Sequence, residues 1–93
     1  MPKYLIERTY DVDEEGLPEV ATRSKRIALE QFPDIVWLHS HVVVDADGNL
    51  KSFCVYIAPN EEIVRRHAEL LGNHIIEKLY EIGGDVTPAD FPL

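Results

Sequence analysis

The fold of this chain is decided by the stretch from Ile35 to Pro59, which reads IVWLHSHVVVDADGNLKSFCVYIAP. Both halves of the stretch are rich in β-branched and aromatic residues, the types that pack well on a pleated sheet. Between the halves lies the segment from Asp45 to Asn49 (DADGN), whose Asp-Gly and Gly-Asn pairs supply the positive φ angles of hairpin turns. The stretch therefore predicts two antiparallel strands joined by a turn.

The register of this hairpin determines which side chains share a face of the sheet. A turn at Asp47-Gly48 is the strongest short hairpin signal available, and it gives a loop with an even number of residues. An even loop places His41 opposite Cys54 and His39 opposite Tyr56, so all four side chains share one face. An odd loop would send Cys54 and Tyr56 to the other face, away from both histidines. We predict the even loop. Trp37 alternates in step with the histidines and is expected on their face.

The segments before the hairpin predict a strand and a helix. The alternation of KYLIERTY from Lys3 to Tyr10 indicates a strand with Tyr4, Ile6 and Arg8 on one face. Apolar residues at helical spacing then begin at Leu17, with Pro18 in the first turn, where its missing N–H is tolerated. This helix is expected to end near Gln31 or Phe32, because Pro33 prevents its continuation.

The segments after the hairpin predict a second helix and a last strand. Asn60 is expected to cap a helix that ends at Gly72-Asn73. We predict a short helical turn after that point and then a strand over Lys78 to Ile82 (KLYEI). The residues from Asp85 to Leu93, with two prolines, are expected to form an extended tail that covers an edge or reaches a partner subunit.

The order strand, helix, strand, strand, helix, strand is typical of an α+β protein with the ferredoxin-like βαββαβ arrangement. The chain of 93 residues is expected to be one domain, with both helices on one face of a four-stranded antiparallel sheet. The other face would then expose aromatic and imidazole groups, which favours a homodimer of the dimeric α+β barrel kind, closed through the open sheet faces.

The composition excludes some classes of partner. Seventeen acidic residues against nine basic ones give a net charge of -8, which argues against nucleic acid and anionic membranes. No apolar run is long enough to cross a bilayer. The single cysteine excludes an intrachain disulfide, so we expect a protein of the reducing cytoplasm.

The hairpin also carries the candidate metal ligands. Imidazole and thiolate are ligands that zinc, nickel and copper prefer, and His39, His41 and Cys54 would supply three of them on one face. A fourth ligand would come from Glu7 or from a partner subunit. The alternative interpretation is that Cys54 is a small buried apolar residue and the histidines are hydrogen-bonded lining residues.

The two remaining histidines have other expected environments. His67 lies on the apolar stripe of the second helix, which favours a core histidine with one satisfied hydrogen bond. His74 follows the predicted helix end and is expected at the surface, where the helix dipole favours imidazolium.

Several short blocks resemble a small bacterial family of ferredoxin-like proteins described as nickel-binding. The blocks run in order from Met1-Pro2-Lys3-Tyr4 and Ile6-Glu7-Arg8 through Trp37-Leu38-His39-Ser40 to Cys54-Val55-Tyr56-Ile57-Ala58-Pro59 with Glu62 and His67-Ala68. The resemblance implies a dimer that binds a divalent transition metal, nickel by family, and it keeps His67 among the candidate ligands. The loop from Asp45 to Asn49 and the segment from Gly72 to Tyr80 depart from the family pattern.

The sequence favours a binding protein over an enzyme, because it contains no Gly-rich phosphate loop, GxSxG motif or P-loop. A second hypothesis remains open. In a dimeric α+β barrel, Trp37 and Tyr56 would line a cavity between the sheet and the partner subunit and bind or transform a small organic ligand. Assembly or binding to a protein partner, without a small ligand, is a third hypothesis.

Overall fold

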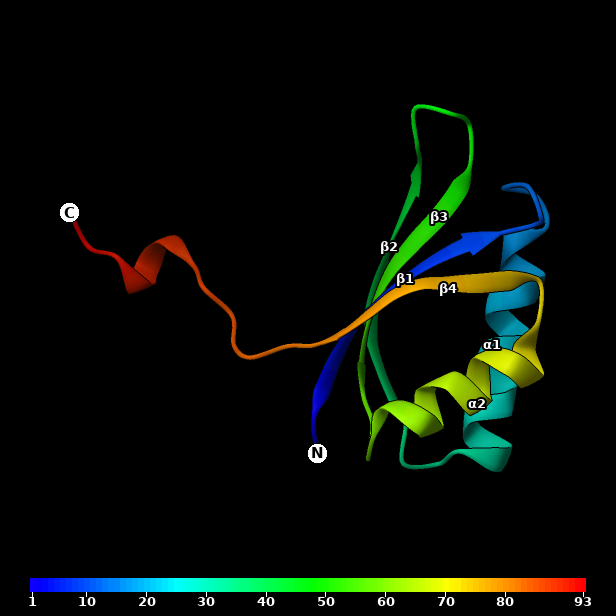
Figure 1. The fold of residues 1–93 in the computed structure, drawn as a ribbon, viewed down its shortest axis with the longest axis horizontal. Coiled ribbons are helices and arrows are strands. Elements are labelled where there is room, and N and C mark those ends of the chain that lie inside the picture. Colours follow the sequence, from blue (N-terminus) through cyan, green and yellow to red (C-terminus); the bar gives the residue numbers. More distant parts are fainter.

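The computed structural model describes residues 1–93 and has the predicted ferredoxin-like α+β architecture. A single antiparallel sheet has the strand order β2-β3-β1-β4, and Figure 1 shows both helices against one face of it. The other face of the sheet is covered by no element. The elements are β1 (Lys3–Tyr10), α1 (Leu17–Gln31), β2 (Val36–Val44), β3 (Leu50–Ile57), α2 (Glu61–Leu71), β4 (His74–Glu81) and the short 3₁₀ helix η1 (Pro88–Asp90).

Both helices begin and end where their local sequence predicts. Pro18 occupies the first turn of α1. The side chain of Asn60 caps α2 by accepting a hydrogen bond from the backbone N–H of Ile63 at 2.9 Å. Helix α2 ends at Gly72, whose φ of 69° lies in the left-handed region that favours glycine.

The last strand differs from the prediction at its beginning. The expected helical turn after Gly72 is absent, and β4 starts at His74 rather than at Lys78. The reason is that Gly72 and Asn73 both have positive φ, so the chain reverses within two residues. Strand β4 then pairs with β1 from Tyr10 opposite His74 onward.

The hairpin has the odd loop, so the predicted register was wrong. Val44 pairs with Leu50, which leaves five residues, Asp45 to Asn49, in the loop. The Asp45 carboxylate fixes this loop by accepting hydrogen bonds from the backbone N–H groups of Asp47 and Asn49 at 3.0 and 2.9 Å. These bonds, with the Asn49 backbone contribution first, hold the pKa of Asp45 below its usual value.

The odd loop moves Cys54 opposite Ser40, whereas His41 pairs with Phe53 and His39 with Val55. An irregularity in β2 between Trp37 and His39 then shifts the alternation by one residue. Trp37 therefore pairs with Tyr56 and lies on the face of Ser40, opposite to the expectation that it would accompany the histidines.

The core fills the layer between the sheet and the helices. Ile6 and Val64 are fully buried there, and Cys54 and Tyr56 lie beside them. No helix of the structure is long and apolar enough to span a membrane.

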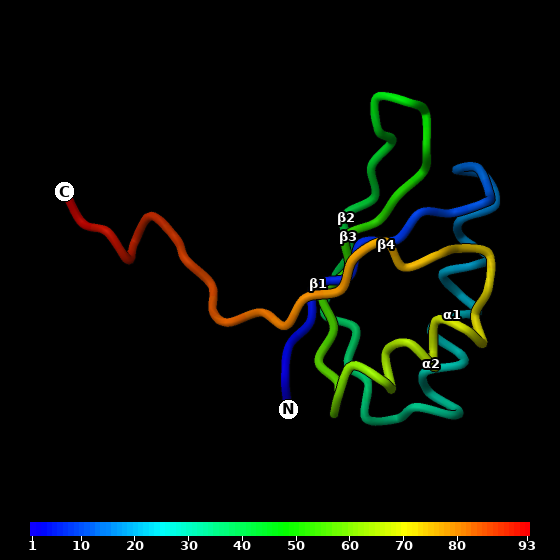
Figure 2. Tube along the Cα trace, in the orientation of Figure 1, coloured from blue at the N-terminus to red at the C-terminus, as the bar shows by residue number.

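The C-terminal residues after β4 form an arm that leaves the body of the protein. Figure 2 shows this arm projecting on the side of the sheet away from the helices. An ion pair between Lys3 and Asp85 (3.1 Å) ties its start to β1. Further along, Val86, Phe91 and Leu93 expose apolar side chains.

Candidate functional site

The open face of the sheet carries a pair of histidines on its edge strand. His39 and His41 are two residues apart on β2, and their ring centroids lie 5.4 Å apart with the rings nearly perpendicular. Both side chains are exposed, and neither makes a hydrogen bond within the chain. Two free imidazoles this close provide a ready pair of nitrogen ligands for a transition metal ion.

Glu7 lies on the same face but is not beside the histidine pair. It pairs with Phe53 of β3, which in turn pairs with His41, so Glu7 and His41 are two strands apart, roughly 10 Å. The Glu7 carboxylate forms an ion pair with the Lys51 ammonium at 2.9 Å, and both side chains are partly buried. Glu7 is therefore not positioned to bind the same ion as His41 of its own chain.

Cys54 lies on the helix-covered face, away from both histidines. Its thiol is 4% exposed and sits 3.3 Å from the Ser52 hydroxyl. The alternative interpretation of Cys54, a small buried residue, describes its environment. The predicted cluster of His39, His41 and Cys54 is not formed, because the odd hairpin loop separates the thiol from the imidazoles.

His67 is a core residue of α2 with no exposed surface. Its Nε2 lies 3.0 Å from the backbone carbonyl of Ser24, to which it donates, and its ring edges contact Phe32 and Tyr56. Burial lowers the pKa of His67, so the imidazole is neutral at pH 7. His67 and the histidine pair lie on opposite sides of the sheet and do not form one site.

His74 is not the surface residue expected from the sequence. It begins β4, its Nδ1 donates to the Gly72 carbonyl at 2.8 Å, and its Nε2 accepts from Arg8 Nη1 at 3.1 Å. Burial lowers the pKa of His74 as well, which is consistent with this neutral tautomer. The surface prediction was wrong because it placed His74 at a helix end, whereas His74 is the first residue of β4 and pairs with β1.

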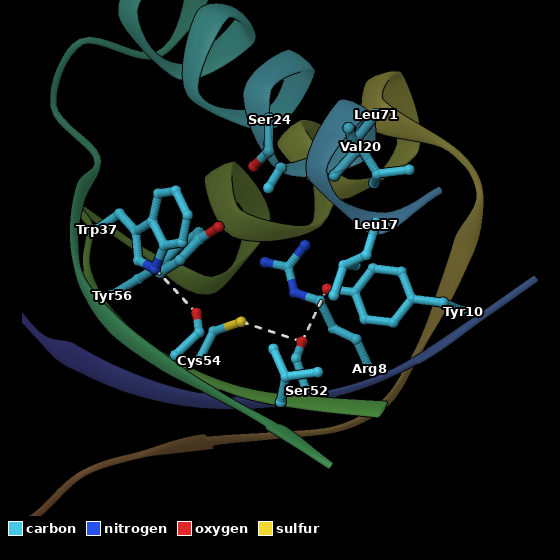
Figure 3. Close-up of a pocket in the computed structure, with 13 residues that line it drawn as sticks. Arg8, Tyr10, Leu17, Val20, Ser24, Trp37, Ser52, Cys54, Tyr56 and Leu71 are labelled. Carbon is cyan, nitrogen blue, oxygen red and sulfur yellow. Dashed lines mark hydrogen bonds between the residues drawn. The ribbon is translucent and has the colours of Figure 1, made fainter. Parts of the chain in front are cut away.

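Arg8 was missed as a functional candidate, although a signal was present. The alternation of β1 places Arg8 on the face of Tyr4 and Ile6, and a charged residue in an otherwise apolar row is unusual. In the structure Arg8 lies between the sheet and the helices and is only 1% exposed. Figure 3 shows its guanidinium projecting from β1, with Tyr10 on one side and Tyr56 on the other.

Trp37 and Tyr56, the predicted ligand-binding pair, both line a cavity on the helix-covered face. The cavity lies between the sheet and α1. This is a different place from the predicted one between the sheet and a partner subunit. Tyr56 is buried, and burial raises the pKa of its phenol.

One chain offers a metal ion two neighbouring side-chain ligands, His39 and His41. No group of three or more histidine, cysteine, aspartate or glutamate side chains lies close enough together to hold an ion. The two imidazoles fit nickel chemically, since nickel accepts nitrogen ligands, but a complete coordination shell needs further donors from solvent or from a second chain.

The fold and the histidine pair define a small ferredoxin-like α+β protein with an open, imidazole-bearing sheet face. The chain belongs to the SCO4226-like family of nickel responsive proteins, which it matches over residues 4–82. This match confirms the nickel-related family expected from the short sequence blocks. Searches of curated proteins and of solved structures give no match.

Proposed function

We propose that this chain binds a divalent transition metal ion, nickel before others, through His39 and His41, and that a second copy of the chain completes the ligand set. The observation that supports this proposal is the pair of exposed imidazoles, 5.4 Å apart and free of hydrogen bonds. These imidazoles would break no hydrogen bond within the protein when they bind a metal ion. The family description supplies nickel as the first metal to test.

A second copy is part of the proposal because one chain provides too few donors. Two open faces that pack together about a two-fold axis would bury the half-exposed apolar side chains of this face beside the histidine pair, Leu5 and Phe53. The exposed Ile75 and Tyr80 of β4 lie on the same face and would also be covered. The arm projects on this side of the sheet with Phe91 exposed, so a copy packed there would lie beside it.

Metal binding is tested by calorimetric titration of chelator-stripped, tag-free protein with Ni²⁺ and Zn²⁺. We expect His39→Ala and His41→Ala each to weaken nickel binding at least tenfold, because each removes half of the ligands that one chain supplies. Cys54→Ala is the matched control and should keep wild-type affinity, since its thiol lies on the covered face. Unchanged affinity in both histidine variants, or a loss confined to Cys54→Ala, would refute the proposed site.

Dimer formation is tested separately by sedimentation equilibrium with and without Ni²⁺. Phe53→Lys introduces a charge in the centre of the open face, next to His41, without touching the helix-covered core. We expect this variant to be monomeric and to bind nickel more weakly. A monomeric variant with full nickel affinity would show that one chain and solvent provide the whole site.

A further inference from the structure

Arg8 is a buried charge without a counter-charge. Its guanidinium makes one hydrogen bond, from Nη1 to Nε2 of His74, and one cation–π contact, with the Tyr56 ring centroid 5.1 Å from Cζ. Nε and Nη2 are buried and have no hydrogen-bond partner. None of the ion pairs in the structure includes Arg8. Burying an unpaired charge has a large free-energy cost, and a bound anion beside the guanidinium would lower that cost.

The groups around Arg8 are neutral. His74 accepts from Arg8 as a neutral imidazole, because its Nδ1–H donates to the Gly72 carbonyl. The phenol of Tyr10 is bonded to the Ser52 hydroxyl at 2.7 Å, and burial raises the pKa of Tyr10. No carboxylate of the chain therefore neutralises the guanidinium.

The unpartnered atoms of Arg8 form one edge of the guanidinium. Nε and Nη2 carry parallel N–H bonds, and this edge matches the two oxygens of a carboxylate in a bidentate pair. The hydrogen bond to His74 uses the other terminal nitrogen, so it fixes the orientation of the plane and leaves the binding edge free.

A cavity of about 60 Å³ adjoins this guanidinium between the sheet and α1. Figure 3 shows Arg8 among the lining side chains, with the Ser52 hydroxyl linked to both Tyr10 and the Cys54 thiol. The volume corresponds to about two water molecules, which suits a carboxylate group and little more. The apolar part of the lining consists chiefly of Leu17, Val20, Val42 and Leu71.

A second hollow of about 350 Å³ lies beside the first, between α1 and β2. Both cavities are lined by Ser24, Trp37 and Tyr56. The remaining lining of the second is mainly apolar and consists of Ala28, Leu29, Ile35 and Val36. An apolar chain attached to a carboxylate in the first cavity would extend into this hollow. The exposed Trp37 side chain stands where the two meet.

We propose that Arg8 binds the carboxylate of a small organic monocarboxylic acid, whose apolar chain lies between α1 and β2. A single guanidinium among neutral groups balances one negative charge, which favours a monocarboxylate over a phosphate dianion. The site lies on the face of the sheet opposite to His39 and His41, so it is independent of the proposed metal site.

The test is titration of the metal-free full chain with sodium acetate, butyrate and hexanoate, against chloride and phosphate at equal ionic strength. Trp37 is the only tryptophan and lines both cavities, so a change in its fluorescence reports binding. Changes in the amide NMR shifts of Ser24 and Ser52 show that the ligand binds in these cavities. We expect affinity to rise from acetate to hexanoate. Arg8→Met should weaken hexanoate binding at least tenfold, whereas Arg65→Met, which removes an exposed arginine of α2, should not change it.

A second variant keeps Arg8 and fills the cavity from the helix side. Ala21 lines the cavity on α1, and Ala21→Leu should abolish hexanoate binding even if Arg8→Met does not fold. Absence of carboxylate binding to the wild type, or equal binding by a folded Arg8→Met or Ala21→Leu protein, would overturn the proposal. Phosphate or chloride binding as tight as hexanoate would also overturn it, because the site would then recognise inorganic anions.

Discussion

The buried imidazole of His67 predicts a loss of stability in mild acid. An imidazole in the unfolded chain has a pKa near 6.5, whereas burial holds the pKa of His67 below that value in the folded protein. Below pH 6.5 the unfolded chain therefore binds a proton that the folded chain does not, and stability falls as pH falls. Between pH 7.5 and 5.5 this effect lowers the free energy of unfolding by at most about 1.4 kcal/mol.

His67→Phe removes the titrating group and keeps an aromatic ring of similar size among Phe32 and Tyr56. The substitution removes the hydrogen bond to the Ser24 carbonyl, so we expect the free energy of unfolding at pH 7.5 to fall by about 1 kcal/mol. Its further loss from pH 7.5 to 5.5 should nevertheless be smaller than that of the wild type by about 1 kcal/mol.

The measurement is urea denaturation at both pH values, followed by tryptophan fluorescence. His39→Phe, the same substitution on the exposed open face, is measured in parallel as the control. The low pKa of His74 contributes in the same direction, so some dependence remains in His67→Phe. If the pH dependence of His67→Phe equalled that of the wild type, the buried neutral imidazole would not be its source.

Substitutions at three further positions test the structure by urea denaturation. Arg8→Met should raise the free energy of unfolding by roughly 1 kcal/mol. The reason is that removing an uncompensated buried charge outweighs the loss of one hydrogen bond and one cation–π contact. A clear decrease in the free energy of unfolding would contradict this expectation. Gly72→Ala should cost about 1–3 kcal/mol, since φ 69° with ψ -169° is a region for glycine, and a neutral result would mean that the turn relaxes. Asn60→Ala should cost about 1 kcal/mol through loss of the α2 cap, whereas Asn60→Ser should retain most of the stability.

The sequence predicted the helices well because their limits are encoded by neighbouring residues. Pro18 and Pro33 bracket α1, and Asn60 and Gly72 bracket α2, each acting through its own backbone or side chain. The beginning of β4 was harder to predict. Its position depends on pairing with β1, a partner more than sixty residues away in the chain.

The placement of the candidate ligands on the two faces of the sheet was predicted in part, and one loop explains the difference. His39 and His41 share the open face, as alternation requires, but Cys54 does not join them. A signal for the odd loop was present in Asp45 and Asn49, since an aspartate at the start of a loop often accepts hydrogen bonds from backbone N–H groups farther on. The Asp47-Gly48 pair predicts a two-residue turn, whereas the five-residue loop observed shifts the register by one residue.

The sequence by itself determined the element order, the ferredoxin-like class and the exclusion of an intrachain disulfide, because these follow from periodicity, chain breakers and composition. Only the tertiary structure decided which histidine, cysteine and arginine side chains lie close together. The five-residue loop and the irregularity after Trp37 assign each side chain of β2 to a face, and the pairing of β1 with β4 brings His74 to Arg8. A shift of one residue along a strand reverses the face of every side chain beyond it, so the sites depend on register, which is settled by packing between distant segments.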